Sequence, residues 1–124
     1  MPQKAHWVGT WTTAPAPAEG AALNNHTLRM NARVSIGGDQ LRVRLSNAYG
    51  QRPLAIGGAH IALRPKEAPY SGTIPGAPYD GAAIVAGSDR KLSFGGAASA
   101  TIAVGSLLVS DPVDFPLPPL SDVA

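Results

Sequence analysis

The residues whose side chains could carry out chemistry are few and lie far apart in the sequence. Each histidine stands alone, with no metal-ligating partner three or four residues away. The histidines are His6, His26 and His60. Asp111 and Asp114 are the one close carboxylate pair on an expected loop, and such a pair can bind Ca²⁺ or act in acid–base catalysis. Because Pro112 separates them and no further oxygen ligands accompany them, we expect two solvated turn residues.

The sequence motifs of covalent and cofactor-dependent catalysis are missing. No serine stands in the Gly-x-Ser-x-Gly pattern of a nucleophile elbow, and no glycine-rich phosphate loop occurs. The chain has no cysteine, which excludes disulfides and thiolate metal sites. The sequence therefore predicts no catalytic residue, no metal site and no cofactor in this chain.

Four residues are candidates for contact with a ligand or another domain. Trp7 and Trp11 have the same parity in residues 6–13, so a first strand there would carry both indoles on one face. Indoles placed in this way anchor a core or a domain interface. The alternative is a stacking platform for a sugar ring. Asn47 and Tyr49, which lie in a polar turn after a later strand, complete the set.

The charge of the chain is close to neutral. A formal net charge of +2 is too small for a nucleic-acid-binding footprint. Four arginines predict a basic patch that is solvated or faces another domain, and not an anion site. They are Arg29, Arg33, Arg42 and Arg44. No apolar run is long enough to span a membrane, and no signal peptide precedes Trp7.

The element expected to position these residues is the stretch 28–50, which reads LRMNARVSIGGDQLRVRLSNAYG. Apolar and polar residues alternate on both sides of Gly37-Gly38, with the period of a half-buried strand. We predict a hairpin with its apolar residues on one face. A two-residue loop would place Val34 opposite Leu41, Ala32 opposite Val43 and Met30 opposite Leu45. A four-residue loop keeps the same face and leaves the register open, and a helix over residues 21–36 is the weaker alternative.

Glycine and proline interrupt the rest of the chain. With 14 glycines and 12 prolines among 124 residues, a single all-β domain with many turns is favoured over helices. A strand is expected at 54–63, with a kink at Gly57-Gly58 and an exposed His60. Shorter strands are expected at 82–85, 91–94, 100–104 and 107–110, with the spacing of a sandwich or jelly roll. Residues 64–81 should form a long connection, and residues 111–124 a loose, proline-rich end.

Several blocks of the sequence resemble one known family, in the same order. They are HWVGTWTTAPAPA at 6–18, the stretch at 28–50, PLAIGGAHIAL at 53–63, AIVAGSDRKLSFGG at 83–96 and LLVSDPVDF at 107–115. Together they are similar to the N-terminal portion of bacterial and fungal GDSL-type (SGNH-hydrolase) esterases, over nearly the whole chain. In that family this portion is a β-sandwich of jelly-roll type that precedes an α/β hydrolase domain.

The resemblance implies that the catalytic residues belong to some other stretch of polypeptide. The family's nucleophile stands in a Gly-Asp-Ser block, and an Asp-x-x-His block follows near the end; neither block occurs here. Gly87-Ser88-Asp89 has these residue types in another order, so Ser88 is not carried over as a nucleophile. We therefore expect a non-catalytic domain that packs on and shapes the catalytic domain of an ester hydrolase or lipase, in cis or as a separate chain. The family also implies a secreted or periplasmic protein.

Two more expectations concern the end of the sequence and a rival function. In similar proteins an apolar strand continues after SDVA, and Val123-Ala124 would be only its first residues. The sandwich is then expected to lack its last strand, which another polypeptide would supply. The rival function is a free-standing carbohydrate-binding sandwich, in which Trp7 and Trp11 stack on sugar rings; a purely structural module is a third reading.

Overall fold

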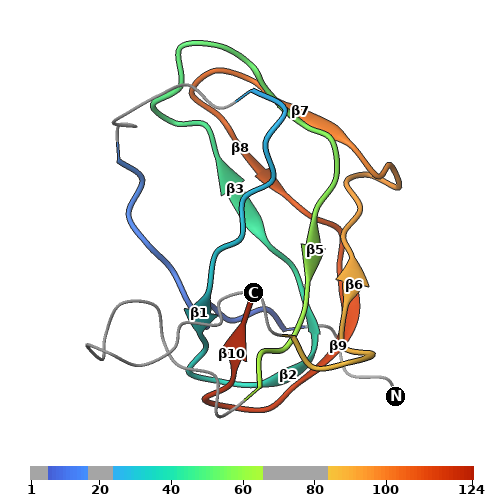
Figure 1. The fold of residues 1–124 in the computed structure, drawn as a ribbon. Coiled ribbons are helices and arrows are strands. Elements are labelled where there is room, and N and C mark those ends of the chain that lie inside the picture. The colour runs from blue at the N-terminus through green and yellow to red at the C-terminus, as the bar shows by residue number, and fades with distance from the viewer. Residues whose placement is uncertain (1–5, 17–23, 66–83) are drawn as a thin grey trace, which may run out of the picture.

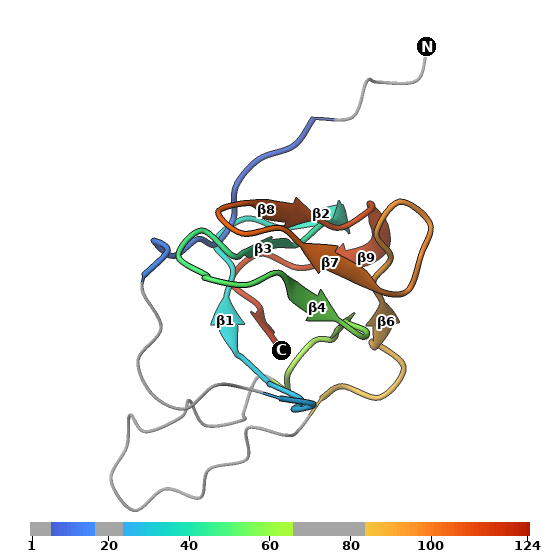
Figure 2. The ribbon, with the colours of Figure 1, turned by 90° about the horizontal axis from the view of Figure 1, so that it is seen from above.

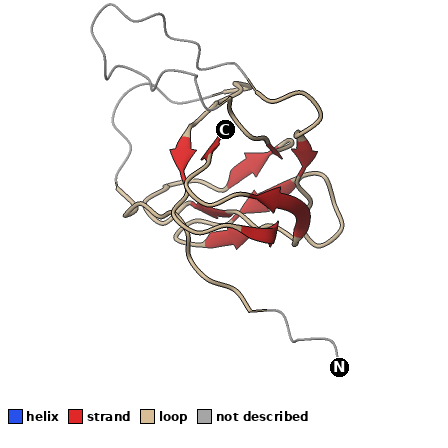
Figure 3. Cartoon of the chain, turned by 90° about the horizontal axis from the view of Figure 1, so that it is seen from below, coloured by secondary structure: helices blue, strands red, loops and turns tan. Residues whose placement is uncertain are grey.

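The described part of the chain consists of short β-strands and loops. The computed structural model describes residues 6–16, 24–65 and 84–124. These ranges contain no helix (Figure 3), which confirms the all-β prediction and rules out the helical alternative over residues 24–36. The strands are β1 (Ala32–Arg33), β2 (Gly38–Leu41), β3 (Arg44–Ser46), β4 (Leu54–Ile56), β5 (His60–Ile61), β6 (Arg90–Lys91), β7 (Ala100–Ile102), β8 (Leu107–Val109), β9 (Val113–Leu117) and β10 (Asp122–Val123).

The strands pair in a nested antiparallel order. β1 pairs with β10, β2 with β9, β3 with β8, β4 with β7 and β5 with β6. The chain therefore forms one long ribbon that folds back between β5 and β6, so that its two arms run side by side (Figures 1 and 2). Among the described residues the strands pair only two by two, and the jelly-roll sandwich stays a prediction.

The predicted hairpin within residues 28–50 is wrong. Ala32 lies opposite Val123 and not opposite Val43. The other expected pairs are also replaced by distant ones, Leu41 with Val113 and Leu45 with Leu108. Gly37, expected in a tight turn, packs instead against the backbone of residues 117–119, where a Cβ atom would overlap the carbonyl oxygen of Leu117. The C-terminal segment thus occupies the place beside this stretch that we expected its own second half to take.

The C-terminal segment is not the loose end that its prolines predicted. Phe115, Leu117 and Val123 expose 2%, 7% and 8% of their surface and form the central cluster of the core with Val34. Pro116 fits within β9 because the register with β2 shifts there, and proline, which lacks an N–H, is tolerated at such irregularities. This segment carries the largest fully buried side chain, Phe115, and so determines where the core lies.

Several local predictions are confirmed. β4 and β5 are separated at Gly57-Gly58, and the chain changes its pairing partner there from β7 to β6. The strands expected at 100–104 and 107–110 correspond to β7 and β8.

Other strand predictions differ from the structure. Residues 84–85 are not a strand, and β6 comprises only Arg90–Lys91 where a strand over 91–94 was expected. Most of the expected long connection, residues 66–81, and the beginning of the strand expected at 82–85 lie outside the described residues.

The buried position of Phe115 gives a direct stability prediction. Phe115→Ala should lower the free energy of unfolding by about 3 kcal/mol or more, because it removes apolar contacts and leaves a cavity. The matched control, Leu107→Ala, shortens a side chain that is 57% exposed and should cost less than about 1 kcal/mol. Urea unfolding followed by circular dichroism measures both changes. Equal losses for the two variants would contradict the placement of β9 in the core.

Candidate functional site

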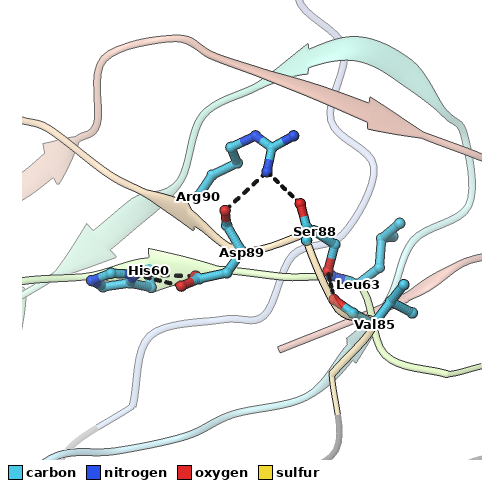
Figure 4. Close-up of polar contacts among 7 residues, drawn as sticks. His60, Leu63, Val85, Ser88, Asp89 and Arg90 are labelled. Atoms are coloured by element: carbon cyan, nitrogen blue, oxygen red, sulfur yellow. Dashed lines mark hydrogen bonds and ion pairs between the residues drawn. The ribbon is translucent and has the colours of Figure 1, made fainter.

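The pairing of β5 with β6 brings a histidine and a carboxylate together. His60 of β5 and Asp89, which directly precedes β6, meet with His60 Nδ1 at 3.1 and 3.2 Å from the two carboxylate oxygens (Figure 4). The side chains of His60 and Asp89 are 56% and 48% exposed. The predicted exposure of His60 is thus confirmed, while its carboxylate partner was not foreseen. A carboxylate on Nδ1 orients an imidazole, as in catalytic and metal-binding histidines.

Ser88 lies beside this pair but is committed to the backbone. Its hydroxyl donates to the carbonyl oxygen of Val85 at 2.7 Å and accepts the N–H of Leu63 at 3.0 Å (Figure 4). In the described part of the chain no serine hydroxyl is hydrogen-bonded to a histidine. Ser88, Asp89 and His60 therefore do not form a nucleophile and base, although they are the three residue types of a hydrolytic triad.

A small cavity next to this turn does not complete a site. It has a volume of about 230 Å³ and is lined by residues 86–88, Arg90, Phe115–Pro116 and Leu63. Arg90 lines it, and one nitrogen of its guanidinium, Nη1, donates to the carbonyl oxygens of Gly87 and Asp89 at 2.8 and 2.9 Å. Neither side chain of the His60–Asp89 pair is among the described residues that line this space. This cavity is therefore not lined by the pair that could transfer a proton.

Asp111 is a structural residue and not the solvated turn residue that we expected. Its carboxylate accepts hydrogen bonds from the hydroxyl of Ser93 at 2.8 Å and from the N–H groups of Gly95 and Gly96 at 3.0 and 2.8 Å. The two glycines have φ angles of +60° and +86°, which turn their N–H groups toward one acceptor. These bonds, led by the one from Gly96, hold the pKa of Asp111 below its usual value of 3.8.

Asp114 serves another contact, so the two carboxylates do not form one centre. It accepts a hydrogen bond from Nε2 of Gln40 at 2.7 Å, across the pair of β2 and β9. No group of three or more His, Cys, Asp or Glu side chains within residues 6–16, 24–65 and 84–124 is arranged to hold a metal ion. The two carboxylates therefore take part in separate hydrogen-bonded contacts.

Trp7 and Trp11 lie at the surface. They expose 36% and 55% of their area, and the described segment around them contains no strand, so the predicted first strand and the reading as core anchors are wrong. The guanidinium of Arg42 stacks 4.3 Å from the ring centre of Trp7. Thr10, between the tryptophans, holds this segment by accepting the N–H of Ser35 through its carbonyl oxygen at 3.1 Å. Contact with a ligand or another domain remains open to both indoles.

Of the two candidates in the turn after β3, Asn47 is buried and Tyr49 is exposed. Asn47 is 9% exposed, and its Nδ2 donates to the carbonyl oxygens of Arg52 and Ile102 at 2.8 and 3.1 Å. A Cβ atom on Gly50 would overlap the Asn47 amide, so this turn accepts only glycine there. Tyr49 is 59% exposed. Asn47 is therefore a positioning residue, and Tyr49 is the one of the two that another molecule can reach.

The four arginines expected to form a basic patch do not share a hairpin face, because that hairpin does not exist. Arg33 pairs across β1 and β10 with Asp122, whose side chain is only 5% exposed, at 3.0 Å between Nε and Oδ1. Arg42 stacks on Trp7. Arg29 and Arg44 are exposed. The charges are thus distributed among separate elements, which agrees with a solvated or domain-facing role and not with a single anion site.

Comparison with known proteins adds no relative. No protein-family model matches the sequence, and no characterised protein matches it. No helix among the described residues is long and apolar enough to cross a membrane.

The lowered pKa of Asp111 predicts a pH-dependent contribution to stability. Because the pKa is lower in the folded chain than in the unfolded chain, ionised Asp111 stabilises the fold above its usual value of 3.8, and this stabilisation is lost as the pH falls through the lowered pKa. Asp111→Asn should therefore lower the melting temperature at neutral pH, and the difference from the wild type should shrink in acid. Thermal unfolding over a pH series measures this.

Asp114→Asn is the matched control for that series, since Asp114 accepts a single described hydrogen bond at an exposed position. Its melting temperature should stay closer to that of the wild type. A loss for Asp111→Asn that is the same in acid as at neutral pH would contradict the assignment.

Proposed function

We propose that this chain is a non-catalytic β-sandwich domain of a GDSL-type ester hydrolase, which packs on the catalytic domain and helps to shape its substrate cleft. The observation that carries the proposal is a contrast within the described residues. Their polar side chains are used to fix loops, whereas several large apolar side chains are exposed. Trp11, Leu28, Met30, Tyr49, Leu107 and Leu120 expose between 55% and 72% of their surface. Exposed apolar groups of this size are what a partner surface would cover.

The placement of the family-like blocks supports the proposal. The block at 28–50 meets the block at 107–115 through the pairing of β3 with β8. Ser110 of the second block also accepts the N–H of Val43 through its hydroxyl and donates its own N–H to the Val43 carbonyl oxygen, each at 2.8 Å. Blocks that are separated in the sequence are thus in contact in the fold, as one inherited structural unit requires.

The proposal predicts a specific pattern of activity. This chain alone should not hydrolyse short acyl esters, because its described residues hold no hydrogen-bonded nucleophile and base. Activity should appear when a segment with a Gly-Asp-Ser block is joined or added to it. A p-nitrophenyl acyl ester assay of the chain alone, the added segment alone and the two together measures this. Ester hydrolysis by the purified chain alone would contradict the proposed role, and its loss in Ser88→Ala would identify the nucleophile.

A second candidate function is a carbohydrate-binding module, and it is favoured by one observation. Both indoles, at Trp7 and Trp11, are accessible, as stacking on sugar rings requires. On this reading Arg42 restrains the Trp7 ring, since it covers one side of it.

The second candidate is tested by affinity electrophoresis in gels that contain soluble polysaccharides. Trp11→Ala should abolish a retardation with a dissociation constant in the micromolar-to-millimolar range, while circular dichroism shows an unchanged fold. Leu120→Ala, at another exposed apolar residue, is the matched control. No retardation of the wild-type chain, or equal retardation of Trp11→Ala, would remove this candidate.

A further inference from the structure

One partly buried arginine lines the cavity beside the Ser88 turn. Arg90 lies opposite Ile61 in the pair of β5 and β6, two residues before Leu92, which is 2% exposed. Because side chains alternate along a strand, Arg90 is on the same face as Leu92, toward the core, and the exposed Lys91 is on the other face. A guanidinium on the inner face of a strand loses part of its hydration and needs hydrogen-bond acceptors or an anion there.

The protein uses only part of the hydrogen-bonding capacity of this guanidinium. Nη1 of Arg90 donates to the carbonyl oxygens of Gly87 and Asp89 (Figure 4). No described residue accepts a hydrogen bond from Nε or Nη2, and no described carboxylate forms an ion pair with Arg90. The adjacent carboxylate, that of Asp89, is directed to His60. Nε and Nη2 form the edge of a guanidinium that binds a carboxylate through two parallel hydrogen bonds.

The rest of the cavity lining is mostly apolar and contains no acidic side chain. Its apolar members are Leu63, Ala86, Phe115 and Pro116. Among the described residues that line the space, Arg90 is therefore the one with a charged side chain. The volume of about 230 Å³ is larger than the ~150 Å³ of an apolar cavity that accommodates benzene, so there is room for a small organic molecule. An anion with a short apolar part matches both features of the lining.

Hydrogen bonds and the core fix the walls of the cavity. Val85 donates its N–H to the carbonyl oxygen of Leu63 at 2.7 Å. The hydroxyl of Ser88 joins the same two residues, since it donates to Val85 and accepts the N–H of Leu63. Phe115, another wall residue, is 2% exposed and belongs to the central cluster of the core. A preformed cavity binds a small molecule with little loss of conformational entropy.

We propose that this cavity binds a small monocarboxylate. The carboxylate lies on the Nε–Nη2 edge of Arg90, and a short alkyl chain packs against Leu63 and Phe115. One guanidinium without a second cation matches a single negative charge, and the apolar lining disfavours phosphate or sulfate, which need more donors. The site binds its ligand without making or breaking a covalent bond. The inference does not depend on the proposed function.

The test is a titration of the whole isotope-labelled chain with sodium butyrate, followed by nuclear magnetic resonance spectra that include the Nε–H signal of Arg90. Saturable shifts should be confined to that signal and to the amides of residues 63, 86–90 and 115, with a dissociation constant of roughly 1 mM. Butyramide has the same size without the charge, and acetate lacks most of the alkyl chain; each should bind about tenfold more weakly. No saturable shift with butyrate, or equal binding of butyramide or of acetate, would overturn the proposal.

Two variants locate the charge that is recognised. Arg90→Met removes the guanidinium and should weaken butyrate binding about tenfold or more. Lys91→Met, the matched control, removes a charge from the exposed face of the same strand and should bind within about twofold of the wild type. Because Arg90 also holds the turn at Gly87, the spectrum of Arg90→Met first shows whether the fold is kept; if it is lost, butyrate against butyramide on the wild-type chain decides. Equal binding by a folded Arg90→Met would overturn the proposal.

Discussion

Strand β10 lies between two segments from earlier in the chain, and hydrogen bonds join it to both. On one side β10 pairs with β1, which places Ala32 opposite Val123. On the other side, Ala62 and Ala124 exchange backbone hydrogen bonds at 2.9 and 3.0 Å, and Arg64 donates its N–H to Asp122 at 2.8 Å. Val123 brings its side chain into the cluster with Phe115 from this position. The other pairs are nested inside this outermost pair, so that each strand of the first arm meets a strand of the second arm.

The amino-acid pattern was sufficient to predict local features, namely where some strands lie and where one is interrupted. Gly57-Gly58 interrupts a strand because glycine weakens strand pairing, and alternation located β7 and β8 to within a residue or two. The same alternation failed in the stretch 28–50, since period two reports which face of a strand is buried and not which strand lies beside it. Proline counts failed at 111–124, where an irregular register accommodates Pro116 inside a strand.

The candidate sites show the same difference between local features, which the sequence predicts, and contacts between distant residues, which it does not. The exposure of His60 follows from its phase, but its contact with Asp89 spans 29 residues and depends on the pairing of β5 with β6. Asp111 reaches its partners in residues 93–96 across 15 to 18 positions, a separation for which the sequence carries no signal. Trp7 and Trp11 were expected to form a strand because they alternate; in the structure Arg42 and Thr10 hold this segment without strand pairing.

Polar residues in this chain mainly fix loops, and apolar residues are left to make contacts. Asn47, Ser88 and Asp111 each bind backbone groups from a second segment, which satisfies those groups where no strand ladder does. Short strands in two-stranded pairs leave many backbone groups in need of such partners. Ser88 and Asp111 are occupied by backbone groups in this way, whereas large apolar side chains such as Met30 and Leu120 are exposed.

The nested pairing is tested most directly by nuclear Overhauser effects between backbone protons of the whole chain. The fold predicts contacts between Ala32 and Val123 and between Leu45 and Leu108, which lie opposite each other in the antiparallel pairs of β1 with β10 and β3 with β8. Contacts between Ala32 and Val43 in place of these would indicate a local hairpin, and would contradict the core built on the C-terminal segment.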